Sequence, residues 1–166
     1  VGMIARGGSQ PQTGCMLLLA LVRAFAPRQG LEMGTCVGVS AAYQAAAMRL
    51  AGHGELVTLE SYGSLVEHAR ELWTRIGLDN VTARVGRFDQ TLPQVLKGDP
   101  IDYAYIDGNH QRAATVEYFE RISDAAAPGA LLIFDDIDWS PGMSQAWEQI
   151  CQHPQVAQHA HTGRLG

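Results

Sequence analysis

Residues 31–40 read Leu-Glu-Met-Gly-Thr-Cys-Val-Gly-Val-Ser, and this stretch decides the fold. It joins a short apolar strand, expected over 30–33, to an alanine-rich helix, expected over 39–51. Two glycines, Gly34 and Gly38, permit positive φ angles and a close approach of the backbone to a ligand. The N–H groups at the start of the helix favour an anionic or hydroxyl-rich ligand. The stretch therefore predicts an α/β protein with a ligand at the end of its first strand.

The rest of the chain repeats the pattern of a strand followed by a helix. Apolar segments predict further strands over 56–60, 81–85, 101–106 and 130–134. Helices are expected over 13–25, 65–76 and 112–126, from 141 onward, and as a short helix that follows 86–89 and ends at 96. Continuous apolar strands of this kind form a parallel sheet covered by helices on both sides. We therefore expect a doubly wound, mostly parallel, Rossmann-like α/β sheet in one domain, residues 1–166, with a flexible segment at 1–12.

The pattern weakens after Pro154. Residues 156–161 and 164–165 are expected to form a short hairpin, in which a last strand would be truncated or incomplete. The helix from 141 has a clear start, because Ser140 is a favoured N-cap residue and Pro141 suits the first helical position.

Composition narrows the class of protein. The chain has 166 residues, 46% hydrophobic and 17% charged, as one globular domain with a core would have. Its formal net charge of −5 argues against a nucleic-acid or anionic-membrane partner. No apolar run reaches the roughly 18 residues that span a bilayer, and no secretion signal is evident. Three widely spaced cysteines without a C-x-x-C motif predict reduced thiols and a cytoplasmic location.

Acidic residues end several of the expected strands. Ligands of open parallel sheets bind beyond the carboxyl ends of the strands, so these acids converge on the expected site. Glu60 ends the second strand, where a carboxylate can accept hydrogen bonds from both hydroxyls of a ribose, although a solvated residue or a helix cap is the plainer alternative. The glycine spacing lacks the third glycine of G-x-G-x-x-G, which disfavours a nicotinamide dinucleotide.

A second acidic group comprises Asp107, Asp135 and Asp136, at the ends of two successive strands. Close carboxylates repel one another, and a divalent cation relieves that repulsion. All-oxygen ligation favours a hard ion, Mg²⁺ in the first place and Ca²⁺ or Mn²⁺ as alternatives. Without a metal, Asp107 would be a turn residue before Gly108, and one of the other two aspartates would cap the next helix.

Four more residues near this edge are candidates for the site, and three of them have a plainer alternative. His110 is a candidate general base or a surface loop residue. Arg87 and Phe88 follow the third strand and can flank a planar base, unless Phe88 belongs to the core. Trp139, close in sequence to Asp135 and Asp136, either contacts substrate or packs within its loop.

In four stretches, 31–40, 57–60, 105–110 and 134–140, the chain resembles class I S-adenosylmethionine-dependent methyltransferases, especially the bacterial small-molecule O-methyltransferases. The resemblance implies a seven-stranded sheet whose last strand is antiparallel, with S-adenosylmethionine as cofactor. It places Glu32, Gly34 and Ser40 around the methionine part, Glu60 on the ribose and 86–88 beside the adenine. The full implied set of cofactor residues is Glu32, Gly34, Thr35, Gly38, Ser40, Glu60, Arg87, Phe88 and Asp107.

The resemblance also implies a reaction, the transfer of a methyl group to a hydroxyl of a small molecule. Asp107, Asp135 and Asp136 would hold Mg²⁺, and Asp107 and His110 are the expected catalytic residues. Some metal-dependent relatives carry an acidic base two residues after the first metal aspartate; this chain has Asn109 there, so His110 is the expected substitute. The expected partner is a small-molecule acceptor, and a homodimer is compatible with the sequence.

Three alternatives stay open from the sequence. A metal-independent methyltransferase acting on nitrogen or RNA would keep the cofactor site, although RNA would require a basic face. A nicotinamide-dependent oxidoreductase is opposed by the missing glycine. A catalytically silent nucleoside-binding module would bind the cofactor and transfer nothing.

Overall fold

The computed structural model describes residues 10–166 of the chain. Residues 1–9 of the predicted flexible segment lie outside the described residues. Of the remainder of that segment, Gln10 is buried and Gln12 already begins the helix α2 (Gln12–Phe25). The predicted helix over 13–25 is therefore confirmed, with one more residue at its start.

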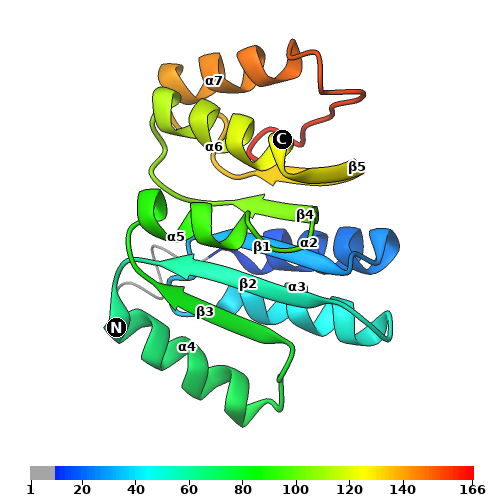
Figure 1. The fold of residues 1–166 in the computed structure, drawn as a ribbon, viewed down its shortest axis with the longest axis vertical. Helices are drawn as coiled ribbons and strands as arrows, with labels where there is room; N and C mark the ends of the chain where they lie inside the picture. The colour runs from blue at the N-terminus through cyan, green and yellow to red at the C-terminus, as the bar shows by residue number, and fades with distance from the viewer. Residues whose placement is uncertain (1–9) are drawn as a thin grey trace.

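Within residues 10–166, five parallel strands form one sheet in the order β3-β2-β1-β4-β5. All the arrowheads point to the same edge of the sheet (Figure 1). The strand order reverses between β1 and β4, which makes the carboxyl ends of these two strands the switch point of the sheet. The strands are β1 (Gln29–Met33), β2 (Glu55–Glu60), β3 (Val81–Val85), β4 (Ile101–Ile106) and β5 (Ala126–Phe134).

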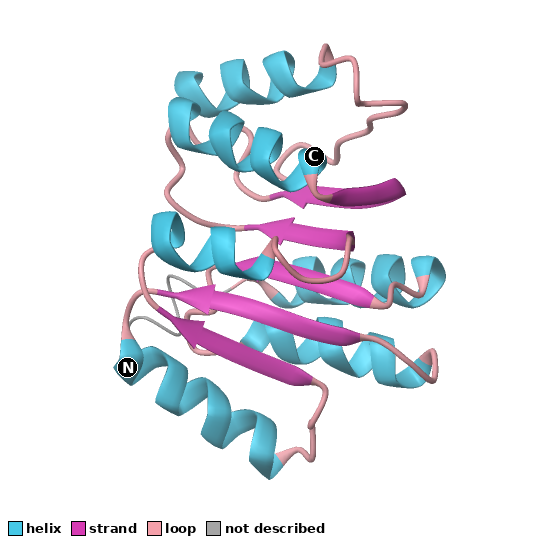
Figure 2. Cartoon of the chain, in the orientation of Figure 1, coloured by secondary structure: helices cyan, strands magenta, loops and turns pink. Residues whose placement is uncertain are grey.

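Helices lie on both sides of the strands (Figure 2), as the sequence predicts for a doubly wound sheet. On one face, Leu18 of α2 shares a core cluster with Tyr103 of β4. On the other face, Phe119 shares a second core cluster with Leu31 of β1. The first face carries α2, α3 (Val39–Leu50) and α4 (Gly63–Arg75), and the second carries α5 (Phe88–Val95), α6 (Arg112–Asp124) and α7 (Pro141–Cys151).

Most predicted boundaries agree with the structure, and β5 is the main difference among the strands. The predicted strands over 81–85 and 101–106 coincide with β3 and β4. Strand β5 starts at Ala126, four residues before the prediction, because Ala126 pairs with Ile101 ahead of an irregularity in the register. Pro128 and Gly129 interrupt the apolar pattern there and hide this first part of the strand. The predicted cap of α7 is confirmed, since the Ser140 hydroxyl accepts from the Met143 N–H at 3.2 Å.

The predicted hairpin near the C-terminus is wrong, because no strand forms over 156–166. This stretch is mostly exposed and Leu165 is its one buried residue, so it has no apolar face with which to pair. Gly166 instead exchanges two backbone hydrogen bonds with Phe134, of 2.9 and 3.1 Å, and the Ile137 N–H donates to the Arg164 carbonyl at 3.0 Å. These bonds fix Arg164 beside the carboxyl end of β5. Among the described residues, no helix has the length and apolar content to cross a membrane.

Candidate active site

The glycine turn after β1 has the predicted backbone conformation, with φ of 106° at Gly34 and 80° at Gly38. A Cβ atom at Gly34 would lie 2.0 Å from the carbonyl oxygen of Asp107, and one at Gly38 would lie 2.6 Å from the Cβ of Ala69. Both glycines therefore make room for neighbouring segments of the chain as well as adopting positive φ. Gly34 in particular allows the ends of β1 and β4 to touch at the switch point. Contact of this turn with a ligand stays a prediction.

Glu32 is fully buried on β1 and accepts hydrogen bonds from three side chains. The donors are Ser40 Oγ at 2.7 Å, Gln44 Nε2 at 2.7 Å and Thr58 Oγ1 at 2.6 Å. Burial raises the pKa of Glu32 to about 7, although these hydrogen bonds oppose the rise. Gln44 in turn accepts from the Tyr103 hydroxyl at 2.8 Å.

Sequence reasoning found Glu32 and Ser40 and missed the rest of this network. The one signal for Gln44 was its position four residues after Ser40, which places both on one face of α3. Thr58 and Tyr103 gave no signal, because polar residues inside predicted strands do not reveal which buried group they meet.

Glu60 ends β2 and is tied to the glycine turn. Its Oε2 accepts from the Cys36 N–H and its Oε1 from the Tyr62 N–H, both at 3.0 Å. Cys36 has a φ of 48°, in the left-handed region, so the carboxylate holds a strained residue of the turn in place. The hydroxyl oxygens of Thr35 and Thr58 lie 2.7 Å apart and share a hydrogen bond. The structure thus places Glu32, Thr35 and Glu60 around one turn, as predicted.

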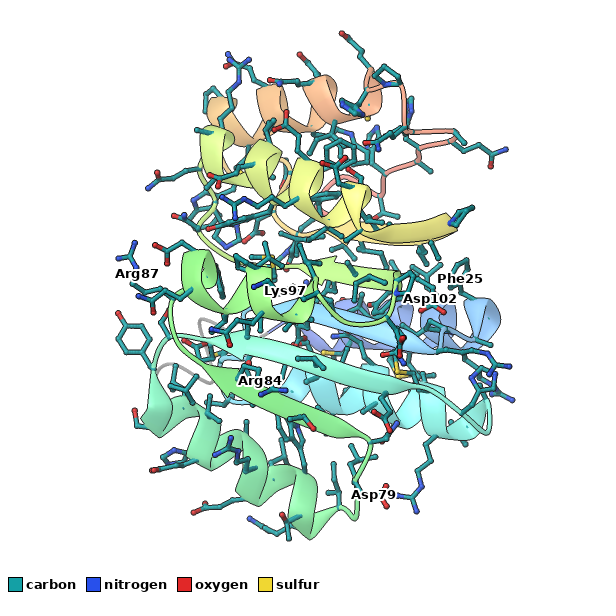
Figure 3. All side chains as sticks on the ribbon, in the orientation of Figure 1. Phe25, Asp79, Arg84, Arg87, Lys97 and Asp102 are labelled. Atoms are coloured by element: carbon teal, nitrogen blue, oxygen red, sulfur yellow. The ribbon has the colours of Figure 1, made fainter. Side chains whose placement is uncertain are left out.

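Arg87 and Phe88 follow β3 at the same edge. Figure 3 shows Arg87 pointing away from the sheet, and its guanidinium pairs with the Asp89 carboxylate at 3.1 Å. Phe88 packs edge-to-face on Tyr118, with 5.8 Å between ring centroids, and its ring lies close over Gly108. Phe88 therefore has the packing role that the sequence left as its alternative. Contact of either residue with an adenine stays a prediction.

Asp135 is buried directly after β5, and both of its carboxylate oxygens are engaged. Arg164 donates from Nε to Oδ1 at 2.8 Å and from Nη2 to Oδ2 at 3.1 Å. The Tyr105 hydroxyl donates to Oδ2 at 2.8 Å, and the Gln10 side-chain amide donates to the same oxygen. Arg164 and Gln10 come from segments where the sequence showed no motif, and neither was predicted.

Asp107, His110 and Asp136 form a group whose ligand atoms lie within 4.8 Å of one another. His110 Nε2 is 3.6 Å from Asp107 Oδ1 and 3.8 Å from Asp136 Oδ2. Burial, followed by the charge of Asp135, raises the pKa of Asp107 to about 8, and the same two causes raise the pKa of Asp136. The structure thus gathers two of the three predicted metal ligands together with the predicted base.

Trp139 stands beside this group as a large exposed aromatic side chain. Its side chain is 70% exposed, and its ring centroid lies 6.4 Å from that of His110, with 43° between the planes. An exposed indole in a loop contributes little to the core, and contact of Trp139 with a substrate stays a prediction.

The family model that matches this chain and the similar solved structures below are all described as methyltransferases. A family model described as a methyltransferase domain matches residues 31–137, from the glycine turn to the acidic pair. An O-methyltransferase from Bacillus cereus, solved with SAH, is 27% identical at a TM-score of 0.79, over 89% of this chain and 73% of that chain. The O-methyltransferase TomG from Streptomyces achromogenes, involved in tomaymycin synthesis and solved with SAM, is 26% identical at a TM-score of 0.77, over 87% and 70%.

A methyltransferase from Geobacter sulfurreducens is 25% identical at a TM-score of 0.75, over 92% of this chain and 76% of that chain. Among curated proteins, no sequence matches the chain significantly.

Proposed function

This chain belongs to the methyltransferase-domain family, and we propose that it transfers a methyl group from S-adenosylmethionine to a hydroxyl group of a small molecule. One observation carries the proposal. The family match runs over the glycine turn, Glu60 and the acidic edge formed by Asp107, Asp135 and Asp136, and the fold brings these together around its switch point. The similar Bacillus cereus and Streptomyces achromogenes proteins are O-methyltransferases solved with SAH and SAM.

The cofactor site is proposed at the turn between β1 and α3. Glu60 is 9% exposed and already orders the turn through the Cys36 N–H, which leaves its remaining lone pairs to accept from ribose hydroxyls. Glu32 and its donors stiffen the strand end beneath the methionine part. The proposed cofactor residues are those expected from the sequence: Glu32, Gly34, Thr35, Gly38, Ser40, Glu60, Arg87, Phe88 and Asp107.

The proposed reaction is an in-line displacement, in which the acceptor oxygen bonds to the methyl carbon while the carbon–sulfur bond breaks. The protein mainly aligns the two reactants, and such alignment contributes up to about 7–11 kcal/mol in the best cases. His110 is 30% exposed at the acidic edge and, when its Nε2 is not bound to a metal ion, is the proposed acceptor of the hydroxyl proton. Trp139 is proposed to contact the acceptor.

We also propose that a divalent cation binds at the acidic edge. Asp107 and Asp136 offer carboxylate oxygens and His110 offers an imidazole nitrogen, a donor set that suits such an ion. A bound ion would lower the pKa of the acceptor hydroxyl and orient it. Mg²⁺, with Asp135 as a third carboxylate ligand, stays a prediction from the sequence. A single domain over 1–166, a cytoplasmic location, a homodimer and the absence of a nucleic-acid partner also remain predictions.

The test of the proposal starts with cofactor binding. We expect S-adenosylhomocysteine to raise the melting temperature of the protein, and Glu60→Ala to weaken its binding in titration calorimetry. Glu67→Ala, an exposed glutamate on α4, is the matched control and should bind as the wild type does. The absence of a thermal shift at millimolar ligand would overturn the proposed function.

A second measurement separates an enzyme from a silent nucleoside-binding module. Incubation with S-adenosylmethionine and a panel of small hydroxyl compounds should release S-adenosylhomocysteine with at least one acceptor. Cofactor binding with no release across hydroxyl and amine acceptors would instead identify the silent module.

A further inference from the structure

The acidic edge already contains a positive charge that the sequence did not reveal. Arg164 Nε lies 2.8 Å from Asp135 Oδ1 and 3.0 Å from Asp136 Oδ1. Its side chain is 44% exposed, whereas that of Asp135 is fully buried, so the guanidinium covers the two aspartates from the solvent side. Arg164 therefore stands against the carboxylates that an ion held by Asp107, Asp135 and Asp136 would use.

Asp107 and Asp136 each have one carboxylate oxygen next to another protein side chain and one that faces His110. Asp136 Oδ1 pairs with Arg164, whereas its Oδ2 lies 3.8 Å from His110 Nε2. Asp107 Oδ2 lies 3.3 Å from the Tyr105 hydroxyl, whereas its Oδ1 lies 3.6 Å from the same imidazole nitrogen. Asp107 and Asp136 thus each keep one carboxylate oxygen directed to His110, whereas Asp135 has no oxygen directed to it.

We propose that the metal site of this protein consists of Asp107 Oδ1, His110 Nε2 and Asp136 Oδ2, without Asp135, and that it selects a transition metal ion over Mg²⁺. Imidazole nitrogen suits Fe²⁺, Co²⁺, Ni²⁺ and Zn²⁺, whereas Mg²⁺ requires a nearly octahedral set of oxygens. The inference refines the metal part of the proposed function and requires no methyl transfer. It assigns His110 as a ligand in the metal-bound protein, where Nε2 has no lone pair left for a proton, so its role as a base belongs to the metal-free form.

The test compares the affinities of two divalent ions for the full chain. A general change in the electrostatics of the site would affect both affinities equally, so a change in their ratio reports on the ligands. Titration calorimetry with CoCl₂ and with MgCl₂ gives the ratio of the two affinities. His110→Gln replaces the ligand nitrogen with an amide of similar reach and should weaken Co²⁺ binding at least about 10- to 100-fold, the loss that mutation of a group outside the ligand shell already causes, with little change for Mg²⁺. His68→Gln, an exposed histidine on α4, is the matched control and should leave the ratio unchanged.

A second pair of variants tests the exclusion of Asp135. Asp135→Asn and Asp136→Asn each remove one negative charge from the same cluster, so the difference between them reports ligation. We expect Asp136→Asn to weaken both ions more strongly than Asp135→Asn does. Binding of S-adenosylhomocysteine, measured on the same samples, shows whether each variant is folded and tests the proposed function separately.

Several outcomes would overturn this inference. In His110→Gln, these are equal losses of Co²⁺ and Mg²⁺ affinity, or an unchanged Co²⁺ affinity. In the aspartate pair, it is a loss of affinity in Asp135→Asn as large as in Asp136→Asn. In the wild type, it is a failure to bind Co²⁺.

Discussion

Glu32 and Asp135 are two buried carboxylates at the same edge of the sheet, and they are stabilised in different ways. Glu32 is 0% exposed and Asp135 is 1% exposed. Glu32 is surrounded by the neutral donors Ser40, Gln44 and Thr58. Asp135 is paired with the guanidinium of Arg164. One carboxylate lies on the proposed cofactor side of the site, and the other lies on its acidic side.

The difference shows how each side tolerates buried charge. Neutral donors offset part of the cost of burying a carboxylate, and a proton can offset the rest, which is why burial raises the pKa of Glu32 to about 7. A guanidinium keeps its charge at every accessible pH, so the compensation of the buried Asp135 carboxylate depends on Arg164. Glu32 should therefore respond to pH, and Asp135 to the loss of one cation.

The largest effect is expected where the two sides touch. In Gly34→Ala, the new Cβ would lie 2.0 Å from the Asp107 carbonyl oxygen at a φ of 106°, so β1 and β4 must separate at the switch point. We expect a loss of about 4 kcal/mol in the free energy of unfolding, combining backbone strain with a steric clash. Chemical denaturation measures it.

Gly52→Ala is the matched control for backbone strain alone. Gly52 has a φ of 85°, and a Cβ there meets nothing within 4 Å. The control should lose only about 1 kcal/mol. Equal losses in the two variants would show that the contact between the ends of β1 and β4 is unimportant.

The next effect is a pH dependence that belongs to Glu32. The pKa of Glu32 rises from 4.5 to about 7 on folding, so between these values the folded state binds a proton that the unfolded state has lost. The free energy of unfolding therefore falls as the pH rises through this window, by about 3 kcal/mol for a shift of this size. Glu32→Gln should remove this part of the slope, and denaturation at pH 5 and pH 8 for both proteins checks it.

The raised pKa of Asp107 contributes to the slope in the same direction, and part of that rise comes from the charge of Glu32, so Glu32→Gln should also reduce the Asp107 contribution. Parallel pH profiles for the wild type and Glu32→Gln would contradict the proton uptake.

The sequence allowed most of the fold and about half of the site to be predicted. Strand alternation, glycine turns and terminal acids are local patterns, so β3, β4 and the turn at Gly34 were found correctly. The early part of β5 was missed because Pro128 and Gly129 resemble a loop signal, although its pairing with β4 overrides them.

The missing part of the site depends on contacts between distant segments. Arg164 lies in a tail without periodicity, and only the backbone bonds of Gly166 and Ile137 bring it to Asp135. Asp135 and Asp136 are adjacent in sequence and were predicted to act together. They share Arg164, but only Asp136, which has a left-handed φ of 54°, also directs an oxygen to His110. No local pattern predicts that conformation for an aspartate.

A smaller effect is expected from Arg164→Gln on the acidic side. The change leaves Asp135 buried with only neutral donors, the situation of Glu32, and we expect a loss of about 2 kcal/mol in the free energy of unfolding because Arg164 is partly exposed. High salt should reduce this loss only slightly, because Asp135 itself is buried. Arg121→Gln, which breaks a surface pair with Glu117, is the control and should change stability by less than about 0.5 kcal/mol. If both variants lose the same amount, Arg164 is an ordinary surface charge.

Removing one hydroxyl on each side should have effects no larger than that of Arg164→Gln, and their ratio compares how strongly Glu32 and Asp135 depend on a neutral donor. Thr58→Val deletes a donor to Glu32, and Tyr105→Phe deletes a donor to Asp135. Because Asp135 keeps its guanidinium, we expect about 2 kcal/mol for Thr58→Val and about 1 kcal/mol for Tyr105→Phe, within the usual range for buried hydrogen bonds. In the background of Arg164→Gln, the Tyr105→Phe loss should rise toward that of Thr58→Val, since the two carboxylates then have partners of the same kind. A double-mutant cycle measures this coupling, and strict additivity would show that the guanidinium and the hydroxyl stabilise Asp135 independently.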